Sequence, residues 1–328
     1  MEKRVLGRSG LRISPMGLGC WAIGGQFYMD GKIDGYGITN DKESIAAIHA
    51  AIDLGINFID TSDAYGIGHS EEIIGEALVG HREQVVLASK FGYLGNEATK
   101  TLHGYNLDPG YIERACDASL RRLKTDYLDL YQLHVWEISL LEIESVADTL
   151  DRLVDKGKIR TYGWSTDLIG GARLMAERKN CSAIQQQFNI LGGSEEILKL
   201  CEEKKLASIN RSPLAMGLLS GKFSKNSKLT KDDVRGAGHS WAEAFFKDGR
   251  PTEDALVKLD AIRDILTSNG RTPVQGSLAW IWAKSENTIP IPGFKSVTQI
   301  QENAKAMEFG PLTEQQMTEI DRIIANLI

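Results

Sequence analysis

The stretch NFIDTSDAYG at residues 57–66 begins as a buried strand and then changes character. Phe58 and Ile59 are apolar, but Asp60 stands where the apolar run would continue, and Tyr65 follows in a turn-rich segment. Enzymes built as parallel α/β barrels carry their active sites at the carboxyl ends of the strands. The stretch therefore indicates a strand that ends in a functional site, and other strands should show the same pattern.

Short apolar segments alternate with helical patterns along the chain, and eight of them fit buried strands: 13–20, 57–60, 85–90, 128–134, 161–165, 183–188, 206–210 and 288–293. Apolar residues spaced by three and four predict amphipathic helices between them, as in Ile112, Cys116, Leu120, Leu123 and in Ile143, Val146, Leu150, Leu153. Asp41 and Ser70 are expected to cap two helices, because each precedes a glutamate in a first turn. This alternation predicts a (β/α)8 TIM barrel that takes up residues 1–328 as a single domain. An open doubly wound sheet, the alternative, seldom needs so many repeats.

Several segments should decorate the barrel. Residues 4–14 predict a β-hairpin at the end opposite the active site, since a glycine-containing turn divides them. A Gly- and Asp-rich loop at 24–40 follows the first strand, and a long polar loop at 217–251 follows the seventh. An extra helix is expected at about 252–269. A C-terminal helix should pack on the outside of the barrel through Met317, Ile320, Ile324 and Leu327.

Composition narrows the class of protein. The chain has 328 residues and a formal net charge of −6, whereas nucleic-acid-binding proteins are usually basic, so that class is not expected. No apolar run approaches about 18 residues and the N-terminus lacks an apolar core, so neither a membrane span nor a signal peptide is expected. The four cysteines form no CxxC pair and are typical of reduced thiols in a cytoplasmic protein: Cys20, Cys116, Cys181 and Cys201. The oligomeric state is not predicted.

Ionisable residues stand at the ends of three successive strands. Asp60 ends the second predicted strand, Lys90 the third and His134 the fourth, so these groups should converge with Tyr65. Burial of one charge inside a barrel costs several kcal/mol, and Asp60 and Lys90 can offset each other. A cation beside Tyr65 would lower the phenol pKa from about 10 and make it a better proton donor. His134 could then orient a carbonyl oxygen, so the group predicts proton delivery to C=O.

Each residue also has a purely structural interpretation. Asp60 could bond to backbone amides, Lys90 could cap a strand, His134 could be a satisfied core histidine and Tyr65 could merely pack. The coincidence of all four at adjacent strand ends favours the functional interpretation over these separate ones.

The segments FIDTSDAYG, ASKFG, LDLYQLH, GWS, QQQFN, SPLAMGLLSGK and IPGFKSVTQIQEN occur in this order and resemble the aldo-keto reductase superfamily. The resemblance runs from about residue 4 to the C-terminus and is to the bacterial branch with general-stress and inositol-related reductases. It implies an NADPH-dependent alcohol dehydrogenase (NADP+) type of enzyme, which reduces an aldehyde or ketone to an alcohol. Tyr65 would be the general acid, Asp60 and Lys90 would tune it, and His134 would orient the substrate.

The resemblance also implies the cofactor-binding residues: Trp21, Ser165, Thr166, Gln185, Arg211, Ser212, Pro213, Leu214, Gly217, Leu218, Gly293, Lys295, Gln299, Glu302 and Asn303. Ser165 and Gln185 would hold the nicotinamide carboxamide, and Lys295 would pair with the ribose phosphate that distinguishes NADPH from NADH. Two positions depart from the family pattern. Thr166 stands where an asparagine is usual, and Arg211 stands where an aromatic residue often stacks on the nicotinamide.

One motif points elsewhere. GLGCWA at residues 17–22 matches the G-x-G-x-x-A dinucleotide fingerprint, which requires a helix to follow at once. A glycine-rich segment follows instead, so we assign the motif to the first barrel strand and its loop.

The substrate pocket is predicted from aromatic residues in or beside the loops at the barrel mouth: Trp21, Phe27, Tyr28, Tyr93 and Trp136. Loop packing is the alternative interpretation of each. Asp30, Lys32 and Asp34 in the first loop would instead suit a polar or sugar-like carbonyl. The expected partner is therefore a small carbonyl compound of unspecified polarity.

Three other functions are possible. A Schiff-base lyase could use Lys90, but it would need that lysine neutral. A metal-dependent hydrolase would need several ligands at strand ends, and of six histidines His134 alone is placed there, so no metal site is expected. A non-catalytic NADPH-binding regulatory subunit is the third, because potassium-channel β subunits resemble this fold.

Overall fold

The computed structural model describes residues 1–327 and contains a ring of eight parallel strands. Their order around the ring is β3 (Gly17–Gly19), β6 (Phe58–Asp60), β7 (Val86–Phe91), β10 (Leu128–Leu133), β11 (Ile159–Ser165), β12 (Cys181–Asn189), β14 (Ala207–Arg211) and β17 (Thr288–Pro290). The Gly19 amide donates to the Pro292 carbonyl over 3.1 Å, which joins the first strand to the end of the last. The predicted barrel is confirmed, and the open sheet is wrong.

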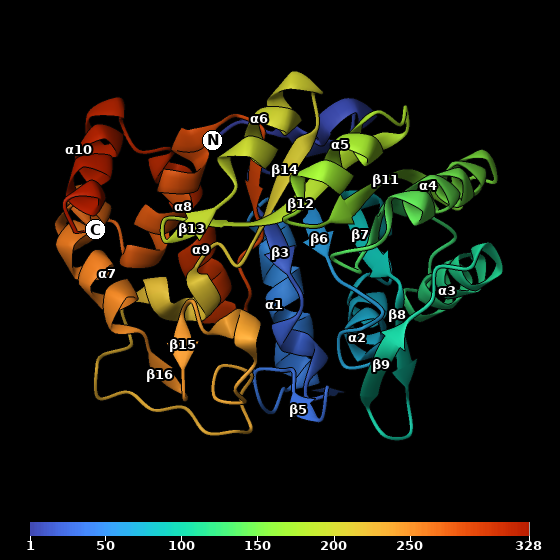
Figure 1. Ribbon diagram of the computed structural model, residues 1–328, viewed down its shortest axis with the longest axis horizontal. Helices are drawn as coiled ribbons and strands as arrows, with labels where there is room; N and C mark the ends of the chain where they lie inside the picture. The colour runs from blue at the N-terminus through green and yellow to red at the C-terminus, as the bar shows by residue number, and fades with distance from the viewer. Residues whose placement is uncertain (328) are drawn as a thin grey trace.

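Helices surround the ring, as Figure 1 shows. They are α1 (Asp41–Asp53), α2 (His69–Ala77), α3 (Pro109–Arg122), α4 (Leu140–Asp155), α5 (Ile169–Ala176), α6 (Glu195–Glu203), α8 (Pro273–Lys284) and α9 (Val297–Phe309). The predicted apolar faces of α3 and α4 are buried. The segment 13–20 is shorter as a barrel strand than predicted, because Ile13 belongs to the hairpin instead.

The two predicted helix caps are wrong. The side chain of Asn40, one residue before Asp41, accepts the Glu43 amide and caps α1. Helix α2 follows a left-handed Gly68 and has no side-chain cap. The hydroxyl of Ser70 instead donates to the Cys20 carbonyl at 2.9 Å, so it ties α2 to the loop after β3.

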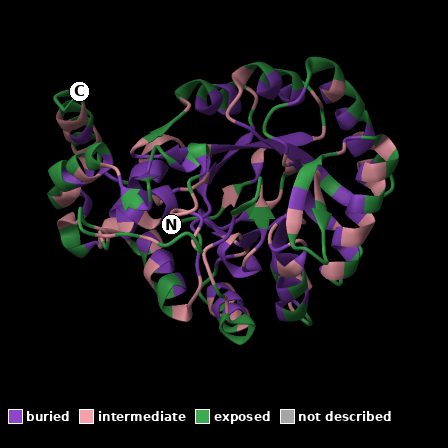
Figure 2. Cartoon of the chain, turned by 60° about the horizontal axis from the view of Figure 1, so that its bottom comes forward, coloured by how far each residue is buried: buried purple, intermediate pink, exposed green. Residues whose placement is uncertain are grey.

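The core has two layers, which appear as buried strands and inner helix faces in Figure 2. Inside the ring, Phe58, Leu130 and Ile209 pack together with Ile289. Between the ring and the helices lies a larger apolar cluster to which α1 to α4 contribute. All four cysteines are buried and unpaired.

The N-terminal hairpin closes the bottom of the ring, as predicted. Strands β1 (Arg4–Val5) and β2 (Arg12–Ile13) pair antiparallel, and Leu6 and Ile13 join the apolar cluster inside the ring. Arg8 donates to the Cys181 carbonyl at 2.8 Å, at the amino end of β12. The carboxyl ends of the strands therefore face the opposite mouth.

Two loops at the mouth contain more structure than the sequence predicts. The loop at 24–40 carries β4 (Tyr28–Met29) and β5 (Lys32–Ile33), which join a hairpin of β8 (Tyr93–Asn96) and β9 (Thr101–Tyr105) in a small sheet. β13 (Gly192–Gly193) pairs antiparallel with the end of β12. The loop at 217–251 carries the hairpin of β15 (Phe246–Lys247) and β16 (Arg250–Pro251). These strands are too short for a recognisable alternation of residues.

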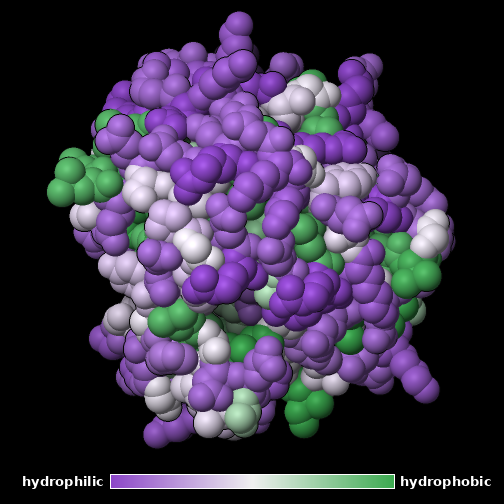
Figure 3. Space-filling view, turned by 90° about the vertical axis from the view of Figure 1, so that its right-hand side faces the viewer, coloured by the Kyte–Doolittle hydropathy of each residue, from purple (hydrophilic) through white to green (hydrophobic). Residues whose placement is uncertain are grey.

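The remaining helices follow the seventh strand and end the chain. α7 (Glu253–Leu266) is slightly shorter than predicted, and α10 (Glu314–Ala325) packs on α7 and α8 through Ile320. Leu327 lies beyond the end of the helix. The face that includes α3 and α4 is largely hydrophilic with scattered apolar groups (Figure 3). Within residues 1–327, no helix combines the length and the apolarity needed to cross a bilayer.

Ring closure depends on the absence of a side chain at Gly19. A Cβ atom there would lie 2.5 Å from the Ile291 carbonyl oxygen, so the first and last strands could not approach. We expect Gly19→Ala to lower the free energy of unfolding by about 1–3 kcal/mol, the usual cost of overpacking. Urea unfolding measures this. Gly170→Ala is the matched control, because a Cβ at this α5 position meets nothing within 4 Å and should be neutral or stabilising.

Candidate active site

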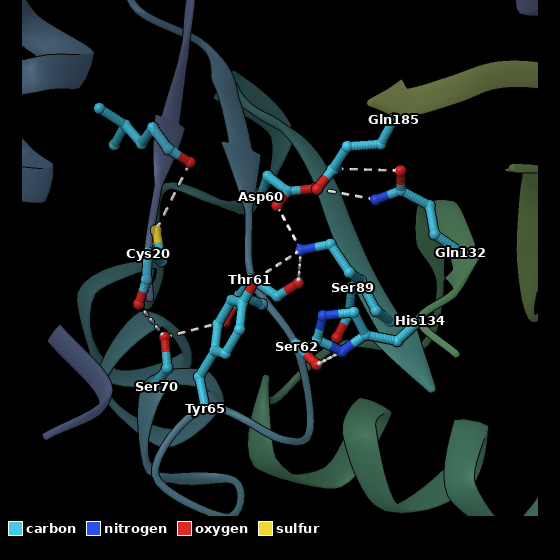
Figure 4. Close-up of polar contacts among 12 residues, drawn as sticks. Cys20, Asp60, Thr61, Ser62, Tyr65, Ser70, Ser89, Gln132, His134 and Gln185 are labelled. Atoms are coloured by element: carbon cyan, nitrogen blue, oxygen red, sulfur yellow. Dashed lines mark hydrogen bonds and ion pairs between the residues drawn. The ribbon is translucent and has the colours of Figure 1, made fainter. Parts of the chain in front are cut away.

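Three neighbouring strands bring the predicted catalytic groups together. Asp60 ends β6, Lys90 lies near the end of β7, and His134 follows β10 directly. The register places Lys90 opposite Gln132 of β10, so both side chains point to the same side of the ring. Tyr65 comes from the loop between β6 and α2 and turns back toward them (Figure 4). The convergence predicted from the sequence is therefore present.

A buried ion pair holds this group together. The Lys90 Nζ atom lies 2.5 Å from Asp60 Oδ1 and also donates to the Thr61 carbonyl at 2.8 Å. The second oxygen of Asp60 accepts from Gln132 Nε2 at 2.8 Å and Gln185 Nε2 at 2.9 Å. Because both carboxylate oxygens are satisfied, the buried charges are compensated, which such a pair requires.

Lys90 extends this network to the phenol. Its third donor reaches the Tyr65 hydroxyl at 3.1 Å. Burial lowers the pKa of Lys90, but Asp60 and Tyr65 outweigh that effect and raise it above the usual value. Lys90 is therefore an ammonium ion at neutral pH, with one of its N–H groups directed at the phenol oxygen.

The pKa of Tyr65 differs from the prediction. Burial raises it above the ordinary value of 10.0, and the opposing effect of Lys90 is smaller. The predicted net lowering is wrong because the effect of burial on the phenol outweighs the effect of the Lys90 charge. Tyr65 thus keeps its proton at neutral pH, while Lys90 reduces the cost of forming a phenolate.

His134 is a neutral, oriented ring. Its Nδ1 atom hydrogen-bonds with the Ser62 hydroxyl at 2.9 Å, and its ring lies edge-on to the Tyr65 ring at a centroid distance of 5.6 Å. Burial lowers the pKa of His134 well below 6.5, and the charges of Lys90 and Arg211 add to this effect. His134 can therefore orient a carbonyl oxygen but is not an imidazolium at neutral pH. Sequence reasoning missed Ser62, although it lies within the opening stretch.

A cavity of about 920 Å³ opens above these residues. Its aromatic part is lined by four of the five predicted substrate residues, Trp21, Phe27, Tyr93 and Trp136, together with Trp241 and Phe245. Tyr28 is not on this wall, because it lies on β4 with 40% of its surface exposed. Trp241 and Phe245 come from the long loop at 217–251, which the sequence did not relate to the pocket.

Most of the residues predicted to bind cofactor also line this cavity: Trp21, Ser165, Gln185, Arg211, Ser212, Pro213, Leu214, Gly217, Gly293, Lys295, Gln299, Glu302 and Asn303. Two others do not. The Thr166 hydroxyl donates to the Trp136 carbonyl at 2.7 Å, and Leu218 is packed in the apolar cluster beneath α8. Arg211 forms an ion pair with Asp167, which also lines the cavity.

The loop after β14 has an unusual backbone. Ser212, Ala215 and Met216 have φ values of 52°, 47° and 56°, a left-handed conformation that costs non-glycine residues free energy. At Gly217, with φ of 88°, a Cβ atom would lie 3.6 Å from Arg235 Nη1. Left-handed backbone in such turns can direct N–H groups toward an anion.

Three cations gather beside this loop. Lys222, Arg235 and Lys295 all line the cavity. Burial lowers the pKa of Lys222 and of Lys295, and the charge of Arg235 adds to the effect on both. Asp233 pairs with Arg235 at 2.6 Å. An anion would stabilise this cluster of positive charges. The first turns of α9 also line the cavity, and the N-terminus of a helix favours a bound anion. The sequence pointed to Lys295, whereas Lys222 and Arg235 were missed.

Comparison with known proteins now identifies the scaffold. The profile of the aldo/keto reductase family matches residues 15–325. The chain belongs to the aldo/keto reductase family. It is 34% identical to the NADP(+) aldo-keto reductase yakc of Schizosaccharomyces pombe over 281 residues, which is 83% of this chain and 80% of that protein.

Solved aldo/keto reductases share the whole fold. The glycerol dehydrogenase AKR11B4 from Gluconobacter oxydans is 28% identical, with a TM-score of 0.84 over 100% of this chain and 96% of that one. An aldo/keto reductase from Klebsiella pneumoniae in complex with NADP and acetate is 25% identical, with a TM-score of 0.72 over 99% and 96%. The resemblance seen in the sequence motifs is confirmed at the level of the family.

Proposed function

We propose that this aldo/keto reductase reduces an aldehyde or ketone to an alcohol with NADPH, with Tyr65 as the general acid. The observation that carries the proposal is the Lys90 ammonium, which donates to Asp60 and to the Tyr65 hydroxyl from one buried position. A phenol held this way keeps its proton until a neighbouring oxygen becomes basic, and its anion is then stabilised at once. His134 orients that oxygen.

The residues that line the cavity have the chemistry needed to bind the dinucleotide. NADPH would supply the hydride. The strained loop at 212–217 and the cations Lys222, Arg235 and Lys295 would hold its phosphates. Ser165 and Gln185 would bind the carboxamide near the catalytic group. Because the amide nitrogen of Gln185 already donates to Asp60 and Gln132, its oxygen is the atom left to accept from the carboxamide.

The test is NADPH oxidation by the purified protein over a panel of aldehydes, ketones and sugar-derived carbonyls, with the reverse reaction assayed on the alcohols. Saturable turnover with any carbonyl supports the proposal. Tight NADPH binding without turnover would instead support a regulatory subunit. A Schiff-base lyase is disfavoured because the pKa of Lys90 is raised, which keeps its amine protonated; borohydride trapping checks this directly.

Preference for NADPH over NADH should depend on Lys295. Its ammonium donates to the Tyr36 and Ile38 carbonyls at 3.0 and 2.6 Å, which holds it at the cavity wall. We expect Lys295→Ala to weaken NADPH binding roughly 10- to 100-fold, the loss of one charge-assisted hydrogen bond. NADH binding should change little, because NADH lacks the phosphate.

Fluorescence titration with both cofactors measures the effect. Lys305→Ala is the control, since Lys305 is exposed on the same helix, α9. An equal loss of affinity for NADPH and NADH would rule out the assigned role of Lys295 and point to Lys222 and Arg235 instead.

A further inference from the structure

Asp34 is a buried carboxyl group without a partner on the wall of the cavity. The residue is 7% exposed and lines the cavity, and its Oδ1 atom is enclosed without a hydrogen bond. Neither of its carboxyl oxygens has a hydrogen-bond or ion-pair partner within residues 1–327. An unsatisfied buried polar group destabilises a protein, so its presence in a cavity needs an explanation.

Other aspartates on the same wall are satisfied. Asp60 pairs with Lys90 and accepts from the side-chain amides of two glutamines. Asp167 pairs with Arg211 and accepts from the backbone amide of Gln187. The catalytic and cofactor regions therefore compensate their carboxylates within the chain. Asp34 differs because its partner would have to come from a molecule that enters the cavity.

The position of Asp34 is fixed with respect to the catalytic tyrosine. Its backbone amide donates to the Phe27 carbonyl at 2.8 Å, and its carbonyl accepts from Trp21 Nε1 at 3.2 Å. The Trp21 ring in turn stacks near the Tyr65 ring, with 6.2 Å between centroids. The Asp34 backbone and the Tyr65 ring thus both contact one indole, and Asp34, Trp21 and Tyr65 line the same cavity.

A hydroxyl group suits this carboxyl better than a cation does. Burial raises the pKa of Asp34 to about 7, and the charge of Asp30 adds to this effect, so both protonation states occur at neutral pH. A hydroxyl can donate to the ionised form and accept from the protonated one. An ammonium ion can only donate, and it would share the cavity with Arg211, Lys222 and Arg235.

We propose that Asp34 is a specificity-determining residue that binds a substrate hydroxyl, so that the preferred substrates are hydroxyaldehydes and hydroxyketones. The inference rests on the proposed carbonyl reduction and names the substrate class for that same site. The aromatic wall packs on the carbon chain, and Asp34 recognises the hydroxyl beyond the reacting carbonyl.

The experiment compares matched substrate pairs in which a hydroxyl replaces a methyl group: glycolaldehyde with propanal, and 4-hydroxy-2-butanone with 2-pentanone. We expect the wild type to favour the hydroxylated member in kcat/KM by roughly 10- to 100-fold in at least one pair. Asp34→Ala should remove this preference, because it should lower kcat/KM much more for the hydroxylated member than for the other member. Asp34→Asn should restore part of the preference, and Asp30→Asn, at an exposed neighbour, should retain all of it.

Thermal unfolding of the same variants separates recognition from a structural role. Because Asp34 lacks a partner, Asp34→Asn should leave the Tm unchanged or raise it. An unchanged preference in Asp34→Ala, or an equal loss for both members together with a lower Tm, would overturn the inference while carbonyl reduction stands. A wild-type preference for aminoacetaldehyde over glycolaldehyde would overturn the hydroxyl assignment. If the wild type reduces no member of any pair and no other carbonyl, the proposed function fails and the inference fails with it.

Discussion

Replacing Tyr65 with phenylalanine is expected to slow hydride transfer roughly 10²–10⁴-fold, the range that a positioned general acid contributes. The substitution removes the hydroxyl that lies 3.1 Å from Lys90 Nζ and keeps the ring between Trp21 and His134. NADPH affinity and stability should therefore change little. The loss should appear in kcat and in kcat/KM alike, because the proton moves only in the transition state.

Single-turnover stopped-flow measurement of NADPH oxidation isolates this step, and a titration of cofactor binding serves as its control. Near-normal transfer by Tyr65→Phe would mean that another group is the acid. His134 is the next candidate by position, but its lowered pKa leaves it neutral at neutral pH, so it would be a weak donor.

Replacing Lys90 with methionine should affect both stability and rate. Methionine fills much of the same space but leaves the Asp60 carboxylate buried without its cation, which costs about 3–5 kcal/mol when one partner of such a pair is removed. The rate should also fall, because Tyr65 loses the charge that stabilises its anion. Denaturant unfolding and stopped-flow transfer measure the two effects separately.

Double variants identify the cause of each effect. Adding Asp60→Asn to Lys90→Met removes the unpaired charge and should recover part of the stability but none of the rate. Combining Lys90→Met with Tyr65→Phe should slow transfer by much less than the product of the single effects, since both act on one proton. Full multiplicativity would show that Lys90 acts elsewhere, and an unchanged unfolding free energy in Lys90→Met would contradict the compensated ion pair.

The sequence alone determined the barrel and the group of polar residues that meet at the ends of its strands. Hydrophobic periodicity is a local property, so each strand and helix could be located without knowledge of its neighbours. A charged residue at a strand end is equally local. Because the order of parallel strands follows the chain from β3 to β17, Asp60, Lys90 and His134 had to meet.

Tertiary structure decided whatever depends on burial and on distant segments. The pKa of Tyr65 is raised because burial in the barrel raises it more than the charge of Lys90 lowers it. The Thr166 hydroxyl bonds to the Trp136 backbone carbonyl instead of lining the cavity. Phe27 lines the cavity whereas Tyr28 is exposed, because side chains point to alternate sides where the chain enters β4.

Some site residues could be recognised only from the packed chain. Lys222 and Arg235 line the cavity together with Lys295, although more than 50 residues separate each of them from Lys295 in the sequence. Asp34 looks like an ordinary loop aspartate until the small sheet, Trp21 and Phe27 enclose it. The burial of a group and the charges around it depend on residues from distant parts of the chain, so no short stretch of sequence reveals them.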